Sequence, residues 1–366
     1  MGKRIVIKIG SNILASSGNG LDIERIRSIV DDISAIHDEG YDPVVVSSGA
    51  IAAGMRNLAL KRKPHDIVLK QAAAAVGQSS LMWAYEKCFG VHGKKVAQIL
   101  LTREDLSDRK RYINSRNTIN TLISYGVIPI INENDTVATD EIRFGDNDHL
   151  ASLVAALIEA ERLIILSDVD GLFTEDPRKN PKASIISKVN KVTSEIERIA
   201  GGVVSNVGTG GMYSKVLAAK RAMNSGITVN IVNGREKGIL LSLLKGERHG
   251  TEFIAKAVRP SQKKMWIAHG IRAKGSVSLD RGAVEAIVKS GKSLLPSGII
   301  SVSGNFDTGD AVYCLDHEGN KIAKGLVNYS SEEIEKIKGK NTREIEGILG
   351  YKYSDEIIHR DNLALL

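Results

Sequence analysis

The stretch from Gly208 to Gly211, with Lys215 four residues further on, combines the residue types that bind a phosphate group. Glycines have no Cβ, so their backbone N–H groups can approach an anion closely. A helix that begins at Met212 would add the partial positive charge of its N-terminus, and Lys215 would place an ammonium group within the first turn. The spacing differs from that of the Walker P-loop. The stretch therefore predicts a nucleotide-phosphate site in a fold of another type, provided that other segments of the chain support it.

Two apolar runs near the N-terminus end in residues that suit the same chemistry. Lys8 stands late in the first run, where burying a lysine is costly unless it faces a site or a partner, and Gly10 and Ser11 follow it. The second run leads into Ser47–Ala50, a turn of small residues before an Ala- and Gly-rich helix start. Small residues allow a ligand to lie against backbone N–H groups, but they also allow a helix to pack closely on a sheet. Both interpretations of Ser47–Ala50 stay open on the sequence alone.

Carboxylates and amides cluster at two further places, Asn132–Asp135 and Gly145–Asp148. Such side chains can hold an ammonium group, orient lysines or coordinate Mg²⁺. Ordinary turns are also rich in Asn and Asp, but each cluster stands next to an apparent core element, which favours a functional interpretation. Ser167 and Asp168 follow another apolar run in the same way. The Asp-x-Asp-Gly pattern that begins at Asp168 is not an EF-hand, because the later acidic ligands and the flanking helix are missing.

The elements that position these residues alternate between short apolar runs and helical patterns over about the first 255 residues. Strands are predicted at Arg4–Ile9, Asp42–Val46, Val96–Leu101, Val127–Ile131, Leu163–Leu166 and Thr228–Val232. Helices are predicted at Leu21–His37, Asp66–Cys88, Asp108–Ser124, Asp148–Glu159 and Met212–Asn224. Apolar strands separated by helices indicate an α/β fold with a mostly parallel central sheet between helices, a three-layer αβα arrangement. Such sheets bind ligands beyond the carboxyl ends of their strands, which is where the polar clusters stand.

The chain changes character near Arg259–Lys264, which we predict to be a linker. Beyond it, short β-like pieces with frequent glycine surround one helical pattern, as in a small, mainly β domain. The strand-like pieces are Gly275–Leu279, Gly298–Val302, Asp310–Leu315 and Lys321–Asn328, and the helix is Ala283–Ser290. The predicted organisation is an α/β domain at 1–258, a linker at 259–264, a mainly β domain at 265–358 and a tail at 359–366.

Composition limits the classes of function. The 366 residues are more than one core usually supports, and 42% hydrophobic with 25% charged residues is ordinary for a globular protein. No apolar run is long enough for a membrane span and no signal-peptide pattern opens the chain, so we expect a cytoplasmic protein without membrane contact. Cys88 and Cys314 belong to no metal or redox motif, which fits a reducing compartment. From Arg259 onward, 16 Lys and Arg stand against 14 Asp and Glu, a balance that does not favour RNA binding.

Taken together, the motifs resemble those of the amino-acid kinase family over nearly the full length of the chain. The segments that carry the resemblance are Lys8–Ser11, Ser47–Gly54, Ile131–Asp135, Gly145–Asp148 and Thr209–Lys215. The C-terminal part is similar to the PUA domain that many bacterial members carry, notably at Ser293–Ile299 and Gly304–Phe306. Each motif is short, but five in order plus the appended domain make a specific match. The resemblance implies the amino-acid kinase fold followed by a small PUA-like domain.

The resemblance also implies a reaction, the ATP-dependent phosphorylation of the γ-carboxylate of L-glutamate with Mg²⁺, which is the first step of proline biosynthesis. Transfer between two anions depends on positioning and positive charge. The attacking carboxylate is already ionised at neutral pH, so no general base is required. By resemblance, Lys8 and Lys215 flank the transferred phosphoryl group and Asp148 holds both lysines by ion pairing.

The other site residues likewise carry over from the family. The expected glutamate contacts are Ser48, Asp135 and Asn147, of which Asp135 suits the α-ammonium group. The expected ATP-binding residues are Lys8, Gly10, Ser167, Asp168, Thr209, Gly210, Gly211, Met212, Tyr213, Ser214 and Lys215. No protein ligand of Mg²⁺ is expected, since this ion usually stays on phosphates and water.

Other activities fit less well. N-acetylglutamate kinase usually has a His-Gly-Gly-Gly type of turn where this chain has Ser47–Ala50, and aspartokinases carry a different first motif and different C-terminal domains. An RNA-binding protein that acts through the PUA-like domain is the alternative from another class. The family further implies a homo-oligomer, either a dimer or a tetramer, and inhibition by proline at or near the glutamate site. It also suggests delivery of the product to glutamyl phosphate reductase.

Overall fold

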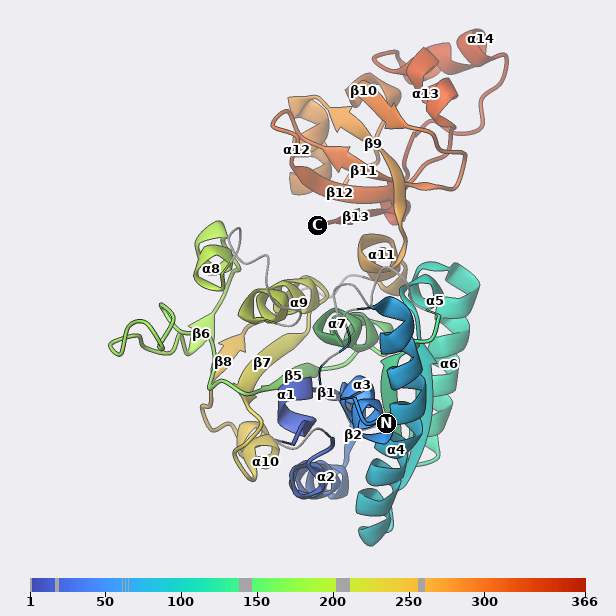
Figure 1. The fold of residues 1–366 in the computed structure, drawn as a ribbon. Helices are drawn as coiled ribbons and strands as arrows, with labels where there is room; N and C mark the ends of the chain where they lie inside the picture. Colours follow the sequence, from blue (N-terminus) through green and yellow to red (C-terminus); the bar gives the residue numbers. More distant parts are fainter. Residues whose placement is uncertain are drawn as a thin grey trace. The chain divides into compact units, whose positions relative to one another are not determined.

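The computed structural model describes residues 2–16, 20–60, 62, 64, 66–137, 147–201, 211–255 and 261–366. The chain forms two compact units, Met1–Leu106 with Lys110–Arg259, and Ser107–Arg109 with Pro260–Leu366 (Figure 1). Every candidate site residue belongs to the first unit. The domain limits that we predicted, 1–258 and 265–358, remain predictions.

An eight-stranded sheet in the order β3-β4-β2-β1-β5-β7-β8-β6 forms the centre of the first unit (Figure 1). Its strands are β1 (Lys3–Ile9), β2 (Tyr41–Ser47), β3 (Lys95–Leu101), β4 (Val127–Glu133), β5 (Arg162–Ser167), β6 (Lys188–Val189), β7 (Thr228–Asn233) and β8 (Thr251–Phe253). All neighbours run parallel except β7 and β8. The central strands are buried along most of their length because helices cover both faces. The predicted fold class is confirmed.

Helices form the outer layers of this unit. They are α1 (Ser11–Leu14), α2 (Ile23–Asp38), α3 (Ala50–Asn57), α4 (Ile67–Val91), α5 (Arg103–Ser107), α6 (Arg109–Ser124), α7 (Asn147–Leu157), α8 (Ser194–Ile199), α9 (Met212–Asn224) and α10 (Ile239–Leu244). Ile5, Ile7 and Ile9 of β1 pack with α2, α4 and α10 in one core. Side chains alternate along a strand, so Lys8 projects from the opposite face, where α7 packs on β1. Within the described ranges, no helix has both the length and the hydropathy to cross a membrane.

The second unit has a sheet and a core of its own. Its five strands, in the order β10-β9-β11-β12-β13, are β9 (Ala273–Leu279), β10 (Ile299–Gly304), β11 (Ala311–Leu315), β12 (Lys321–Leu326) and β13 (Leu363–Leu365). Its helices are α11 (Gln262–Met265), α12 (Arg281–Ser290), α13 (Ser331–Ile337) and α14 (Ile345–Leu349). Val277, Phe306, Cys314 and Tyr329 belong to its buried core. The predicted small, mainly β domain is therefore present.

The last eight residues, 359–366, differ from the predicted tail. Leu363–Leu365 forms the edge strand β13, which pairs antiparallel with β12. Leu363 and Ala364 are buried. A strand of three residues is too short to show an alternating hydrophobic pattern, which needs four or more residues. Its strand conformation comes from the pairing partner rather than from its own sequence.

Candidate active site

The parallel register brings the polar ends of neighbouring strands to one edge of the sheet. Val46 of β2 pairs with Lys8 of β1, and the next residue, Ser47, ends β2. Asn132 of β4 lies at the level of Ser47, and Ser167 ends β5 one position further on. This carboxyl edge is where α/β sheets bind ligands. The predicted site residues of these strands therefore share one location.

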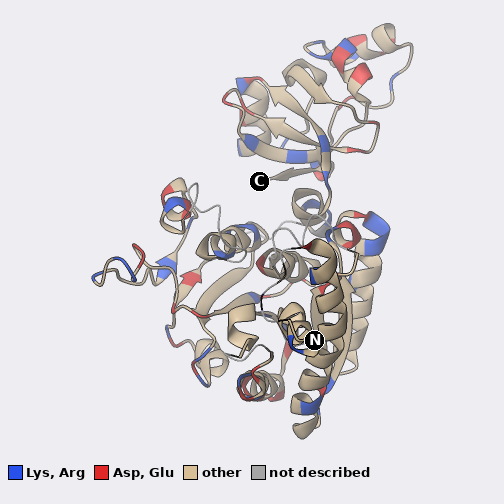
Figure 2. Ribbon diagram, viewed as in Figure 1, with Lys and Arg blue, Asp and Glu red and all other residues tan. Residues whose placement is uncertain are grey.

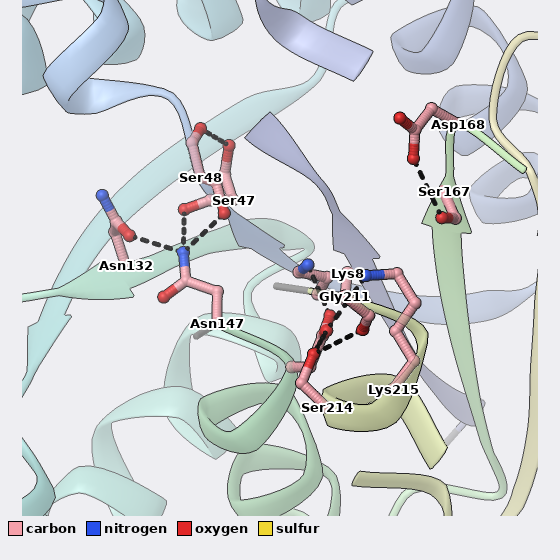
Figure 3. A network of polar contacts seen from close by, with 11 residues as sticks. Lys8, Ser47, Ser48, Asn132, Asn147, Ser167, Asp168, Gly211, Ser214 and Lys215 are labelled. Carbon is pink, nitrogen blue, oxygen red and sulfur yellow. Dashed lines mark hydrogen bonds and ion pairs between the residues drawn. The ribbon is translucent and has the colours of Figure 1, made fainter. Parts of the chain in front are cut away.

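Asp148 joins Lys8 and Lys215 in a buried cluster at this edge (Figure 3). Asp148 stands in the first turn of α7 and is 0% exposed, while Lys8 and Lys215 are 4% and 6% exposed. The Lys8 ammonium group pairs with Oδ1 of Asp148, and Lys215 Nζ lies 3.2 Å from Oδ2. Ser214 Oγ donates a hydrogen bond to the same Oδ2 at 2.8 Å. A strand and two helix N-termini thus meet at one carboxylate.

The three charged groups of this cluster leave an excess of positive charge. Burial by itself would raise the pKa of Asp148, but the charges of Lys8 and Lys215 outweigh burial and hold this pKa below its ordinary value. Asp148 is therefore shared between two buried ammonium groups. Two fixed positive charges at this edge of the sheet suit an anion that lies beside the two lysines.

Asn147, the residue before Asp148, ties α7 to the ends of β2 and β4 (Figure 3). Its Nδ2 donates to the Ser47 carbonyl oxygen at 2.9 Å, to Asn132 Oδ1 at 2.9 Å and to Ser48 Oγ at 3.0 Å. The amide nitrogen is fully used, and Oδ1 of Asn147 has no hydrogen-bond partner in the described part of the chain. The structure thus brings together two of the predicted glutamate contacts, Ser48 and Asn147.

Asp135, the third predicted glutamate contact, lies two residues beyond the end of β4. Its side chain is half-buried, and burial raises the pKa of its carboxyl to about 6. No hydrogen bond joins it to Ser48 or Asn147 in the described residues. A cationic group beside Asp135 would favour its ionised form.

Ser167 and Asp168 lie on the other side of Lys8 from Asn147, because β1 stands between β2 and β5 in the sheet (Figure 3). Asn12 Nδ2 donates to Asp168 Oδ2 at 2.9 Å. Partial burial works against ionisation of Asp168, but the hydrogen bonds to its carboxylate and the nearby charge of Lys215 together outweigh burial, and the pKa of Asp168 lies below its ordinary value. The two sides of the lysine pair therefore differ: serine and amide groups lie on one, and an ionised carboxylate lies on the other.

The remaining predicted ATP-binding residues surround the start of α9. Gly211 is the N-cap of α9, Met212 is half-buried and Tyr213 is exposed. Thr209 and Gly210 lie outside the described residues, as do Gly145 and Asp146. Gly10, predicted to offer its amide to an anion, instead donates that N–H to the Leu166 carbonyl oxygen at 3.2 Å.

Close packing, one of the two interpretations that we left open for Ser47–Ala50, is present where this segment leads into α3. Gly49 has φ 110° and forms the N-cap of α3, a backbone conformation that favours glycine. A Cβ at Gly54 would lie 1.7 Å from the Ala73 carbonyl oxygen, and one at Gly77 would lie 1.8 Å from that of Ala50. The small residues therefore permit close packing between two helices, α3 and α4, rather than between a helix and the sheet.

Sequence reasoning missed two polar residues that α4 contributes to the site. Gln78 Oε1 accepts a hydrogen bond from Asn132 Nδ2 at 2.9 Å, and the Tyr85 hydroxyl lies 2.8 Å from Ser47 Oγ. The two residues are seven positions apart, so they lie on one face of the helix. This seven-residue spacing of two polar groups in an otherwise alanine-rich helix is the sequence signal that could have identified them.

Comparisons with known proteins agree with this architecture. The chain matches the Amino acid kinase family over residues 3–233 and the PUA domain over residues 275–349. The glutamate 5-kinase of Caldanaerobacter subterraneus subsp. tengcongensis is 51% identical over 363 residues, which are 99% of this chain and 98% of that protein. The glutamate 5-kinase of Nitrosospira multiformis is 52% identical over 364 residues, 100% of this chain and 98% of that protein.

A solved structure shares the fold at much lower identity. The carbamate kinase from Giardia lamblia, bound to AMP-PNP, aligns with a TM-score of 0.50 and 20% identity. The alignment covers 70% of this chain and 99% of that one. At this level of identity, the likeness concerns the fold alone.

Proposed function

The chain belongs to the amino acid kinase family, and we propose that it transfers the γ-phosphoryl group of ATP to the γ-carboxylate of L-glutamate. The products are L-glutamyl 5-phosphate and ADP, and the reaction is the first step of proline biosynthesis. The observation that carries the proposal is the buried cluster in which Lys8 and Lys215 share Asp148. Similarity to two glutamate 5-kinases over nearly the whole chain supports glutamate as the acceptor.

The lysine pair explains how two anions can react. The transferred phosphoryl group spreads negative charge over its oxygens in the transition state, and positioned cations stabilise that charge. Lys8 and Lys215 supply two cations on flexible stems, and Asp148 and Ser214 fix where their charges lie. The acceptor carboxylate is already ionised near neutral pH, so the site performs the transfer without a general base.

Glutamate lies on the side of Asn147 and Ser48. Ser48 Oγ accepts from Asn147 Nδ2, which leaves its own proton available for a substrate carboxylate. Asn147 Oδ1 and the Asp135 carboxylate are acceptors suited to the α-ammonium group. This arrangement distinguishes glutamate from N-acetylglutamate, whose amide nitrogen carries no positive charge.

ATP lies on the side of Ser167, Asp168 and the start of α9. The phosphates approach Lys8, Gly10 and the segment Thr209–Lys215. Mg²⁺ would bind mainly to the phosphates and would supply neutralisation of part of their charge. The residues fit that mode of binding, because Asp148 is already held by two lysines and a serine. In the described ranges, no group of three or more His, Cys, Asp and Glu side chains is arranged to hold a metal ion.

The experiment that tests the acceptor is the initial rate of ADP release with L-glutamate, N-acetyl-L-glutamate and L-aspartate offered separately. We expect turnover with L-glutamate only. Faster turnover with N-acetyl-L-glutamate would replace the proposed substrate and keep the fold and the lysine cluster.

Proline is the proposed feedback inhibitor, since it shares with glutamate an α-carboxylate and an α-ammonium group. It would occupy the place of glutamate beside Ser48, Asn147 and Asp135. We expect proline to raise the KM for glutamate and to leave the KM for ATP unchanged. Undiminished activity with millimolar proline at subsaturating glutamate would refute this regulation.

We also propose a homo-oligomer, assembled through the outer face of α4. Val68, Ala72, Ala75, Val76, Ser79 and Trp83 form an exposed stripe without charge on that face, and Trp83 is 59% exposed. The stripe ends at the exposed Glu86 and Lys87, and Lys87 Nζ lies 5.7 Å from the centre of the Trp83 ring. Small residues let two helices approach closely, and a tryptophan at that level of exposure is typical of an interface. A second copy of the same helix offers the same uncharged surface, as a two-fold dimer requires.

RNA is not a proposed partner. In the second unit both signs of charge are mixed over the elements (Figure 2). Several lysines there are paired with carboxylates, for example Lys274 with Asp310 at 2.8 Å and Lys289 with Glu285 at 2.9 Å. Phosphate binding needs clusters of unmatched Lys and Arg. A gel shift with tRNA at low salt should show no retention, and a salt-sensitive complex would reopen the question.

A further inference from the structure

Three buried amides form a chain that leads from α4 to the substrate side of the site. Gln78 Oε1 accepts from Asn132 Nδ2 at 2.9 Å, and Asn132 Oδ1 accepts from Asn147 Nδ2 at 2.9 Å. Asn132 and Asn147 are buried, and Gln78 is half-buried. None of these contacts involves a charged group, so the chain is a set of linked amide dipoles.

Two backbone groups determine which end of each amide is the donor. The backbone N–H of Glu133 donates to Asn132 at 2.9 Å, and the atom that it meets must therefore be Oδ1. The backbone carbonyl of Ser47 accepts from Asn147 at 2.9 Å, so the atom that it meets must be Nδ2. Because a backbone N–H only donates and a carbonyl only accepts, the polarity of the two asparagines is fixed.

This polarity has a consequence for the substrate. Asn147 spends both N–H groups inside the protein and keeps Oδ1 for a ligand, and Ser48 keeps its hydroxyl proton. The acceptor, Asn147 Oδ1, suits the ammonium group of a substrate, and the neighbouring donor, the Ser48 hydroxyl, suits its carboxylate. The opposite orientation of the Asn147 amide would place donors toward the ammonium group and repel it.

Gln78 contributes to the orientation of these amides, and its own contacts are not those of a residue that serves stability alone. Its Nε2 is buried and has no hydrogen-bond partner among the described residues, although most buried polar groups in proteins are paired. The other end of the amide is used, since Oε1 is the acceptor that Asn132 Nδ2 needs. Without that acceptor, hydrogen bonds would hold the Asn132 amide toward Asn147 at its Oδ1 end only.

We propose that Gln78, acting through Asn132, is a positioning residue that, together with the backbone groups of Glu133 and Ser47, holds the Asn147 amide with Oδ1 toward the α-ammonium group of the substrate. The inference rests on the proposed function and names a determinant of its specificity. Gln78 does not touch the reacting atoms. Its effect is confined to the recognition of the ammonium group, so it acts on the KM for glutamate rather than on kcat or on ATP.

The test compares Gln78→Met with Gln78→Glu. Methionine keeps the shape and removes the acceptor, whereas glutamate keeps an acceptor oxygen for Asn132 Nδ2 and replaces the unpaired Nε2 with a second oxygen of an ionisable carboxyl group. We expect Gln78→Met to raise the KM for L-glutamate by about tenfold, the loss of one well-placed hydrogen bond to a charged group. The KM for ATP, kcat and the melting temperature should stay near those of the wild type, and Gln78→Glu should restore most of the loss.

Glutarate, which is glutamate without its α-ammonium group, distinguishes a loss of ammonium recognition from a purely structural effect of the substitution. Its competitive inhibition constant should change less than about threefold in Gln78→Met, because only recognition of the ammonium group is impaired. An unchanged glutamate KM in Gln78→Met would overturn the proposal. So would equal weakening of glutamate, glutarate and ATP, which would indicate a general packing defect. The wild-type rate with L-glutamate tests the proposed function separately, since the inference is judged from ratios of variant to wild type.

Discussion

At the scale of single residues, the site concentrates positive charge where two anions must meet. Lys8 and Lys215 are almost wholly buried and share the carboxylate of Asp148, so neither ammonium group depends on water for its position. Fixed charges act more strongly in a dry site than in water and need no reorganisation during the reaction. The rate of transfer should therefore depend more on these two lysines than on other side chains of the site.

Replacement of either lysine tests that dependence. Lys8→Ala and Lys215→Ala should each lower kcat by at least about 10²-fold, the order expected for a lost transition-state donor. ADP release at saturating substrates measures kcat, and thermal melting checks that the variants are folded. Lys220→Ala is the matched control in the same helix as Lys215, because Lys220 is part-exposed and pairs with Glu197 at 2.7 Å. Near-normal kcat in Lys8→Ala or Lys215→Ala would exclude the role given to that lysine.

The pH dependence of glutamate binding tests the place of Asp135. Burial raises the pKa of this carboxyl to about 6 in the folded protein, and only the ionised form attracts an ammonium group. As the pH falls through 6, Asp135 becomes protonated and glutamate loses a counter-charge. The KM for glutamate should rise by about tenfold between pH 7 and pH 5, while the KM for ATP should not follow the same curve. Asp135→Asn should bind glutamate more weakly and flatten the profile, and a profile unchanged by this substitution would contradict the assignment.

Charged residues of the site were easier to predict than amides. Lys8, Asp148 and Lys215 stand out in the sequence because a charge next to an apolar run needs a partner or a ligand. Gln78 does not stand out, and Asn132 stands out only as one member of a polar cluster, because the function of an amide depends on which of its ends meets which neighbour. That information is set by the backbone groups of Glu133 and Ser47, which only the fold places.

At the scale of elements, long buried strands were predictable and short ones were not. The runs at Arg4–Ile9 and Leu163–Leu166 lie within one residue of β1 and β5, because a strand covered on both faces is apolar throughout. β6 and β13 have only two or three residues, and their pairing partners decide their conformation. The contact of α3 with α4 was also out of reach, since it depends on glycines 23 residues apart in sequence, Gly54 and Gly77.

Substitution of these glycines tests the helix contact. Gly77→Ala places a methyl group against the carbonyl of Ala50, the residue that follows Ser48 and Gly49, and should cost about 1–3 kcal/mol of unfolding free energy. Gly90→Ala, in the same helix with no atom near its added Cβ, should instead stabilise by about 1 kcal/mol. Urea unfolding midpoints measure both. Equal stability of the two variants would mean that α3 and α4 do not pack as closely as described.

At the scale of the whole molecule, we propose association with copies of the chain rather than with nucleic acid, on the basis of the uncharged stripe of α4 and the mixed charge of the second unit. Exposed apolar patches on one helix mark interfaces more often than chance exposure. The charges of the second unit are largely compensated within it. The PUA domain therefore adds a separately folded unit without an evident electrostatic partner.

A single charge on α4 tests the oligomer. Trp83→Glu should lower the mass in solution toward that of one chain, because it replaces the largest apolar side chain of the proposed contact with a carboxylate. Light scattering after size-exclusion chromatography measures the mass. Tyr125→Glu serves as the control, since Tyr125 is an exposed aromatic outside α4, 80% exposed, and its replacement should leave the mass unchanged. A monomeric wild type, or a Trp83→Glu variant of unchanged mass, would contradict this interface.

The most direct test of the central claim is to trap the product with hydroxylamine. An acyl phosphate formed on the side-chain carboxylate of L-glutamate becomes γ-glutamyl hydroxamate, which mass spectrometry distinguishes from the α isomer. We predict γ-glutamyl hydroxamate in step with ADP release in the wild type, and loss of both in Lys215→Ala. ADP release without hydroxamate, or hydroxamate from another acceptor only, would show that the lysine cluster serves a different phosphoryl transfer.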